Sequence, residues 1–387
     1  MKPRALTGLG IVSAAGIGRE AFYRAMAAPV PLAKQPGHPI ESFDAAKYPD
    51  ARIAEVVGFE PAKYLGDKGL RSLDRLTKLL VVAARLAMHD AGFKKDGAYV
   101  SSSPERVGVC CSNAYGSLEA ITELDRVAKL EDARYINPAK FPNTVANSAS
   151  GYVSIWEDLR ALNVSVSDGN CGGLDTAACA DVYLATGRAD AVLIGGGEAL
   201  SEALYLAFHK IGVLDERASC LGEGAALIAL EPMSLARARG ATIRAELMGY
   251  GTSFVAPEGE SLIHASPEAM ERAITSAIAD ANIAPSEVDV VASGVSGLAV
   301  FDKHELGAIA TVLGARVPVA APKAILGETL GAGGAMGIAA ALAWLDGAPP
   351  AVLVRGEAPK DVRTVVVTSM GYYGNASAVV VRRDTLS

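Results

Sequence analysis

The residue best placed to do chemistry in this sequence is Cys171, which lies between a short β-like run and a stretch of small residues. The segment reads Val166-Ser-Asp-Gly-Asn-Cys-Gly-Gly-Leu-Asp175, and we expect a strand that turns sharply into a helix. A helix N-terminus lowers the pKa of a thiol, and its free backbone N–H groups can hold an oxyanion. Cys171 is therefore a candidate nucleophile, and the alternative is a small buried apolar residue.

The composition limits the classes of function that remain. The 387 residues include 36 basic and 43 acidic side chains, which give a formal net charge of −7 and no basic excess to neutralise phosphates. We therefore expect no nucleic-acid partner. Five irregularly spaced cysteines do not form a secreted disulfide framework, so a cytoplasmic location is expected. No cofactor or metal is expected, because Ser13 breaks the dinucleotide fingerprint begun by Gly8-x-Gly10 and no zinc spacing occurs.

The elements that must position Cys171 alternate between β-like runs and helical patterns, which predicts an α/β fold with buried sheets. The expected strands are Arg4–Val12, Val107–Ser112, Val164–Ser167 and Ala191–Gly195. The expected helices are Ser72–Ala91, Asn147–Leu162 and Gly173–Thr186. The longest uncharged run, Thr329–Leu345, is too short for a membrane span and should form a buried helix.

The second part of the chain repeats the first. Leu6-Thr-Gly-Leu-Gly10 is echoed by Leu247-Met-Gly-Tyr-Gly251, and each block leads to a helix that ends in Asp-Ala and then to an apolar strand. A degenerate repeat of this kind predicts two similar α/β halves. We expect them to span residues 1–240 and 241–387.

Several blocks in this order resemble the β-ketoacyl-[acyl-carrier-protein] synthase family, whose members have the thiolase fold. The blocks that carry the resemblance are Ala5–Ser13, Leu73-Asp-Arg75, Arg188–Glu198, Gly222-Glu-Gly224 and Gly371-Tyr-Tyr-Gly374. The resemblance covers nearly the whole chain. It implies a thiolase-like fold with duplicated α/β halves in a layered α-β-α-β-α arrangement.

The nucleophile position does not match the family. Its motif reads Val-Ser-x-x-Cys-x-Ser-Gly-Leu, with the cysteine four residues before the leucine. Four residues before Leu174 stands Asn170, and Cys171 lies one position late. A shift of one residue at a helix start turns a side chain by ~100°.

The two histidines of the family are also absent. The first belongs to His-Gly-Thr-x-Thr-x-x-x-Asp-x-x-Glu, of which Asp302 and Glu305 fit the end and Gly294 takes the place of the histidine. The second belongs to Lys-x-x-x-Gly-His. Here Lys323 is retained and Glu328 replaces the histidine.

These losses bear directly on the reaction. Condensation needs a thiolate to carry the acyl chain and two imidazoles to polarise the malonyl thioester, so it should fail without them. A family scaffold that lacks them resembles the chain-length-factor subunits. We therefore expect a non-catalytic subunit, without activity alone, in polyketide, aryl polyene or fatty acid chain elongation. Two alternatives stay open: a divergent acyltransferase or thioesterase that uses Cys171, and a malonyl-carrier-protein decarboxylase.

The resemblance also implies partners. A catalytic ketosynthase homologue should form a heterodimer with this chain through the strand Val164–Ser167, and an acyl carrier protein should deliver the substrate. The segment Phe141–Val145 and the short link Val213–Leu221 favour the aryl polyene type.

Finally, the resemblance implies which residues shape the acyl tunnel. Phe141, Thr144 and Val145 should reach the partner and help to line its tunnel. Tyr372 and Tyr373 replace the Phe-Gly of the gating loop and are expected to fill the degenerate site.

Overall fold

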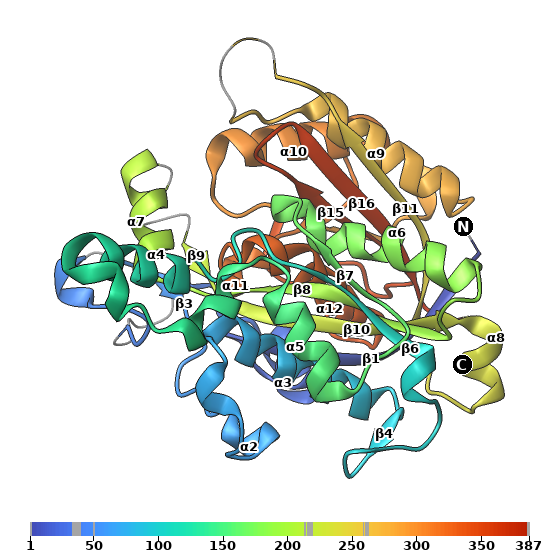
Figure 1. Cartoon of the computed structure of the whole chain (residues 1–387). Coiled ribbons are helices and arrows are strands. Elements are labelled where there is room, and N and C mark those ends of the chain that lie inside the picture. The colour runs from blue at the N-terminus through green and yellow to red at the C-terminus, as the bar shows by residue number, and fades with distance from the viewer. Residues whose placement is uncertain are drawn as a thin grey trace.

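The structure is a computed structural model that describes residues 2–384, apart from 33–39, 49–50, 213, 215–219, 258 and 260–262. The link at 213–221, on which the aryl polyene type was partly predicted, lies largely outside the described residues. The main strands form one continuous sheet of two similar parts, with helices between the parts and on both outer faces (Figure 1).

The N-terminal part of the sheet has five strands. In spatial order they are β1 (Arg4–Ser13), β10 (Gly224–Pro232), β8 (Ala191–Glu198), β6 (Val107–Ser112) and β7 (Asn163–Val166). The first two pairings are antiparallel and the last two are parallel. β7 stands at the edge of the sheet.

The C-terminal part repeats this arrangement. Its strands in spatial order are β11 (Ala245–Phe254), β16 (Asn375–Arg382), β15 (Thr364–Met370), β12 (Val290–Ala292), β13 (Val319–Ala320) and an additional β14 (Leu353–Arg355). The first four pairings have the same directions as in the N-terminal part, and the chain visits the strands in the same sequence. Three residue pairs between β1 and β11 join the two parts.

Helices complete five layers. The central helices α6 (Gly172–Ala185) and α12 (Gly333–Leu345) pack between the two parts of the sheet. The helices α3 (Arg75–Asp90) and α5 (Ser148–Glu157) cover the N-terminal part, while α9 (Pro267–Asp280) and α10 (Ala299–Leu313) cover the other. The predicted fold class, with duplicated halves in α-β-α-β-α layers, is confirmed. The boundary at 240/241 stays a prediction.

Shorter elements surround this framework. They are β2 (Gly16–Ile17), α1 (Arg19–Ala27), β3 (Ile53–Ala54), α2 (Ala62–Leu65), β4 (Lys94–Lys95), β5 (Ala98–Tyr99), α4 (Leu118–Val127), α7 (Glu202–Ile211), β9 (Leu221–Gly222), α8 (Met233–Ala238) and α11 (Lys323–Leu326). Residues 118–147, which comprise α4 and the short turns after it, are called the arm below.

The predicted elements are present, with shifted ends. α3 starts later than expected because Asp74 caps it by accepting the N–H of Thr77 at 2.7 Å. α5 stops at Glu157 because Asp158 adopts a left-handed conformation with φ +52°.

The apolar run 329–345 forms α12, in which every residue is buried, preceded by the turn Leu330–Ala332. Within the described part of the chain, no helix combines the length and the apolar character that a bilayer span requires.

Candidate degenerate ketosynthase site

The turn before α6 buries both candidate nucleophile residues. Asn170 and Cys171 belong to a single 3-10 turn, Gly169–Cys171, which joins directly to α6. The Asn170 carbonyl oxygen accepts the hydroxyl proton of Ser369 on β15 at 2.7 Å. Its side chain is buried in the interior of the molecule.

The thiol of Cys171 is directed at the backbone of β15. It donates to the carbonyl oxygen of Ser369 at 3.3 Å, and the residue has no exposed surface. Burial raises the pKa of the Cys171 thiol well above its ordinary value, and the charges of Asp175 and Asp168 raise it further. The thiol is therefore protonated at neutral pH, as expected for the buried apolar alternative.

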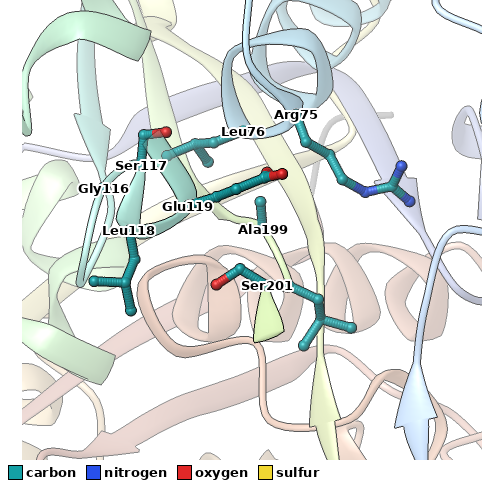
Figure 2. A pocket seen from close by; sticks show the side chains of 9 residues that line it. Arg75, Leu76, Gly116, Ser117, Leu118, Glu119, Ala199 and Ser201 are labelled. Carbon is teal, nitrogen blue, oxygen red and sulfur yellow. The ribbon is translucent and has the colours of Figure 1, made fainter. Parts of the chain in front are cut away.

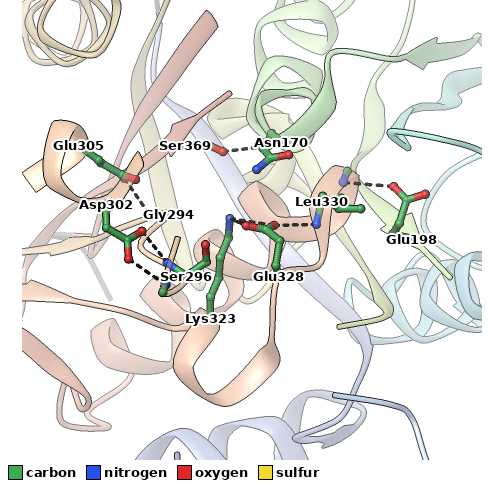
Figure 3. Close-up of polar contacts among 12 residues, drawn as sticks. Asn170, Glu198, Gly294, Ser296, Asp302, Glu305, Lys323, Glu328, Leu330 and Ser369 are labelled. Atoms are coloured by element: carbon green, nitrogen blue, oxygen red, sulfur yellow. Dashed lines mark hydrogen bonds and ion pairs between the residues drawn. The ribbon is translucent and has the colours of Figure 1, made fainter. Parts of the chain in front are cut away.

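Glu328 and Lys323 form a buried ion pair. The Lys323 ammonium lies 2.8 and 3.0 Å from the two carboxylate oxygens of Glu328, and both side chains are buried. The backbone N–H of Leu330 also donates to this carboxylate at 2.9 Å. Leu330 has φ +46°, an unfavourable backbone conformation for a leucine that turns its N–H toward Glu328. Figure 3 shows the carboxylate held between these two donors.

Gly294 stands where the family motif has its first histidine, so only backbone atoms are present there. Gly294 donates its N–H to Glu305 at 2.7 Å, and a Cβ atom at Gly294 would lie 3.0 Å from that carboxylate. Thr368 donates a second hydrogen bond to Glu305 at 2.6 Å. Burial raises the pKa of Glu305, although these donors and the positive charge of Lys323 oppose the shift.

Asp302, in the first turn of α10, is a further carboxylate that the charge of Lys323 influences. It accepts the N–H groups of Ser296 at 3.0 Å and Gly297 at 2.8 Å, and the charge of Lys323 partly offsets the rise in pKa that burial causes. Lys323 therefore pairs directly with Glu328, while its charge acts on Asp302 and Glu305 without a direct ion pair to either in the described residues. The structure joins Lys323 to Glu328 directly and Gly294 to Glu305, and the assignment of these positions to the family motifs stays a prediction.

The two tyrosines have different surroundings. Tyr372 packs between Phe301 and Phe208, with ring centroids 4.7 and 6.4 Å away. Its hydroxyl faces Asn170 and Glu328, and its pKa is raised because the group is buried and because Glu328 is negatively charged. Tyr373, in contrast, has 44% of its surface exposed. Of the two, Tyr372 has its hydroxyl buried beside Asn170 and Glu328, and the expectation that the pair fills the site stays a prediction.

Sequence reasoning missed one member of the site, Glu198 at the end of β8. This buried carboxylate accepts the N–H groups of Ala114 at 2.7 Å, Tyr115 at 3.3 Å and Gly331 at 3.3 Å. Burial raises the pKa of Glu198 to about 7, although the three N–H donors oppose the rise. Glu198 therefore ties three segments together beside the site. A lone acidic residue after three strand glycines was the signal available in the sequence.

The predicted tunnel residues of the arm lie apart from these polar contacts. Phe141 and Val145 are exposed, and the Thr144 hydroxyl donates to the carbonyl of Phe141 at 2.8 Å. Asn143 is buried and donates to the carbonyl of Ser72 at 3.0 Å, which fastens the arm to the body.

A small hollow lies where the arm leaves the body. It measures about 220 Å³, opens to solvent on one side, and lies between the starts of α3, α4 and α7 (Figure 2). Its lining residues are Arg75, Leu76, Gly116, Ser117, Leu118, Glu119, Ala199, Leu200 and Ser201. Two of these segments directly follow Tyr115 and Glu198, so the hollow borders the Glu198 contacts.

Two similar α/β halves around the paired central helices α6 and α12, with Asn170 in the turn directly before α6 and Glu328 in the segment that leads into α12, define a ketosynthase-like chain of the thiolase fold. Residues 1–236 match the family described as "Beta-ketoacyl synthase, N-terminal domain", and residues 244–350 match its C-terminal domain. The chain belongs to the β-ketoacyl synthase family.

Individual relatives agree with this assignment. The chain is 30% identical to "3-oxoacyl-[acyl-carrier-protein] synthase 2" of Coxiella burnetii, over 98% of each protein. It is 31% identical to "Tetracenomycin polyketide synthase ketoacyl synthase beta subunit" of Streptomyces glaucescens, also over 98% of each. Among solved structures, "The ishigamide ketosynthase/chain length factor" has a TM-score of 0.88 at 24% identity, over 99% of both chains, which supports the fold.

Proposed function

We propose that this chain is a non-catalytic, chain-length-factor-like subunit of a heterodimeric β-ketoacyl-carrier-protein synthase, in which it shapes the acyl tunnel for polyketide, aryl polyene or fatty acid chain elongation. The observation that carries this proposal is the buried Lys323–Glu328 pair. It occupies the place where the family motif puts a histidine.

The chemistry of this pair argues against condensation. A malonyl thioester needs neutral donors at its carbonyl oxygen while carbon dioxide leaves. Glu328 offers a carboxylate, which would repel the malonyl carboxylate, and Lys323 is already paired with it. Gly294 contributes no side chain. Losing one oxyanion donor typically costs ~10²–10³ in rate, and here both family donors are gone.

The candidate nucleophiles support the same proposal. Asn170 carries an amide, which a thioester does not acylate under mild conditions. Cys171 is buried, protonated and directed at a β15 carbonyl, which weighs against the acyltransferase or thioesterase alternative. The decarboxylase alternative is not favoured either, because it also needs the missing histidines.

The surface of the arm supports a protein partner. Leu130, Tyr135, Phe141 and Val145 all expose at least half of their side-chain surface. Clustered exposed apolar residues on one segment are typical of a surface that is covered in an assembly. The edge strand β7 offers a further row of backbone groups. The names of the similar proteins mention a beta subunit and a ketosynthase with a chain length factor, which agrees with this interpretation.

The test is reconstitution with a homologue that has the complete Cys-His-His set, sought first in the neighbouring genes. The chain, the homologue and the mixture are each incubated with an acyl primer and a malonyl carrier protein, and each protein is weighed intact. We expect the two proteins to co-purify, no acyl adduct on this chain, and elongated product only when the homologue is present.

A variant separates the alternatives. Cys171→Ser in this chain should leave the product of the complex unchanged, whereas replacing the nucleophilic cysteine of the homologue should abolish it. A stable acyl adduct on Cys171 would overturn the proposal and favour the acyltransferase. A monodisperse monomer after co-expression would remove the heterodimer from it.

A further inference from the structure

A continuous series of hydrogen bonds and adjacent residues runs from the degenerate site to the base of the arm. It begins at the buried Lys323–Glu328 ion pair, whose carboxylate accepts the N–H of Leu330 at 2.9 Å. The next N–H, that of Gly331, is donated to Glu198 at 3.3 Å. Two buried carboxylates therefore hold consecutive N–H groups of the turn that leads into α12 (Figure 3).

Glu198 continues the series toward the arm. The same carboxylate accepts the N–H groups of Ala114 at 2.7 Å and Tyr115 at 3.3 Å. Packing connects the two segments as well, because a Cβ atom at Gly331 would lie 2.6 Å from backbone atoms of both Asn113 and Ala114. The turn before α12 rests directly on the segment that precedes the arm, so a shift of one must displace the other.

Asn113 joins the two ends of the arm. Its side-chain amide donates to the carbonyl oxygen of Ala146 at 2.8 Å, and the residue is 1% exposed. Asn143 adds the contact with the carbonyl of Ser72 at 3.0 Å. Most residues of the arm are exposed or half-buried, so its orientation depends on these few contacts at its base.

We propose that the degenerate site positions the arm. The Lys323–Glu328 pair fixes the turn before α12, and the turn, through Glu198 and Asn113, holds the arm in the orientation that the partner binds. A carboxylate suits position 328 because it accepts the Lys323 ammonium and the Leu330 N–H at once, whereas a neutral imidazole has one acceptor nitrogen. The role in partner binding rests on the proposed function, and the hold on the arm does not.

The test is hydrogen–deuterium exchange of the isolated full-length chain, read in peptides that span residues 118–147. The decisive variant combines Lys323→Met with Glu328→Leu. Apolar replacement of a buried ion pair is often neutral for stability, yet here it removes the acceptor of the Leu330 N–H. We expect exchange in the arm to become at least about tenfold faster, because local opening no longer has to break this contact.

Two single variants test the later contacts. One oxygen of Glu198 accepts the N–H groups of Ala114 and Gly331, and the other accepts that of Tyr115. Glu198→Gln keeps a single acceptor oxygen and must give up part of this set, and Asn113→Ala removes the bond to Ala146. Both should also speed exchange in the arm. If the double variant does not fold, Glu198→Gln decides by the same measurement.

The matched control is Glu231→Gln. Glu231 is a buried carboxylate at the end of β10 that accepts bonds from Thr7 at 2.6 Å and from Arg239 at 2.6 and 2.9 Å. This variant should lower the free energy of unfolding in urea but leave exchange in the arm unchanged. Wild-type exchange in the arm of the double variant, or equal acceleration by Glu231→Gln, would overturn the proposal.

Partner binding is measured separately, as the Kd of each folded variant for the homologue with the complete Cys-His-His set. The double variant should bind at least about threefold more weakly, because fewer copies hold the arm in the binding orientation. Faster exchange in the arm with an unchanged Kd would overturn the role in partner binding. A wild-type chain that does not bind the homologue would contradict the proposed function, while the exchange rates would still decide whether the site holds the arm.

Discussion

The two halves of the molecule hold their outer helices with the same contact. In the N-terminal half, a Cβ atom at Gly10 of β1 would lie 1.8 Å from the carbonyl oxygen of Ala83 in α3. In the C-terminal half, a Cβ atom at Gly251 of β11 would lie 2.2 Å from the carbonyl oxygen of Ala273 in α9. Glycine is required in both strands because the helix backbone rests directly on them.

A hydrogen bond is duplicated as well. Asp90, the last residue of α3, accepts the N–H of Leu9 at 2.8 Å, and Asp280, the last residue of α9, accepts the N–H of Tyr250 at 3.2 Å. The scaffold of the two halves is therefore conserved within one molecule down to single contacts.

The halves differ in what connects these conserved parts. Between the fourth strand in spatial order and the second outer helix, the N-terminal half has residues 113–147, which include the arm. The C-terminal half crosses the same gap with residues 293–298. The comparison teaches that the duplicated contacts support the fold, whereas the asymmetric segments carry the surface that we assign to the partner.

The largest loss of stability is expected when the Lys323–Glu328 ion pair of the C-terminal half is broken. Glu328→Gln leaves the buried Lys323 ammonium without its carboxylate and should lower the free energy of unfolding by about 3–5 kcal/mol. Adding Lys323→Met to this variant should restore part of the loss. Urea titration measures both changes.

The matched control for this pair is an exposed one. Asp125→Asn breaks the exposed contact with Lys129 and should cost about 0.5 kcal/mol or less. A loss at Glu328→Gln no larger than this would show that the ion pair does not stabilise the site.

The contacts of Gly10 with α3 and of Gly251 with α9 test whether the two halves depend equally on this packing. Gly10→Ala and Gly251→Ala should each lower the free energy of unfolding by about 3 kcal/mol, because a methyl group has no room against the helix backbone. Gly151→Ala in α5 and Gly307→Ala in α10 are the controls, one in each half. Their Cβ atoms would meet open space, so about 0.5–1 kcal/mol should be gained in urea titration. If Gly10→Ala and Gly251→Ala lower the free energy of unfolding by clearly different amounts, the two contacts are not equivalent.

Glu198, in the N-terminal half, should make the free energy of unfolding depend on pH. Its pKa is raised from 4.5 to about 7 in the folded protein. The protonated carboxyl is therefore favoured by folding, and its contribution is complete below pH 4.5 and is lost as the pH rises through 7. The free energy of unfolding should fall by about 2 kcal/mol between pH 5 and pH 7 from this group.

The measurement is urea titration at several pH values, with Glu198→Gln as the variant. Because glutamine does not titrate, this substitution should remove the fall of about 2 kcal/mol in the free energy of unfolding between pH 5 and pH 7. An identical slope in the wild type and the variant would show that Glu198 does not titrate in this range.

The smallest expected effect is on product length. In the proposed heterodimer, Thr144→Trp should shorten the chains by one or two units, because a larger wall removes the gain of ~0.8 kcal/mol for each buried CH₂ group. Chromatography of the released chains measures the distribution. Thr311→Trp, on the exposed face of α10, is the control and should leave it unchanged. An unchanged distribution for Thr144→Trp in an intact complex would exclude this segment from the tunnel.

Much of the framework could be predicted from the sequence. The helix α3 and the strand β1 follow from their apolar periodicity, and the repeated Gly-x-Gly blocks indicated the duplication. The positions of Asn170, Gly294 and Glu328 follow from counting along motifs. Counting works because the elements that carry these motifs are regular.

Two features of the site could not be predicted. The direction of the Cys171 thiol depends on its packing against β15, which is distant in the sequence. The role of Glu198 depends on N–H groups from two other segments, Ala114-Tyr115 and Gly331, whose approach only the fold determines. Local patterns carry no information on such contacts.

The exposed arm also has a consequence for the life of the protein in the cell. In the proposed heterodimer the partner covers the arm, so an unassembled copy would present Leu130, Tyr135 and Phe141 to solvent on a segment with few buried residues of its own. Chaperones and proteases recognise such segments, so unassembled copies should be removed faster than assembled ones. The supply of the partner would then set the steady amount of this chain and keep the two in equal number without matched rates of synthesis.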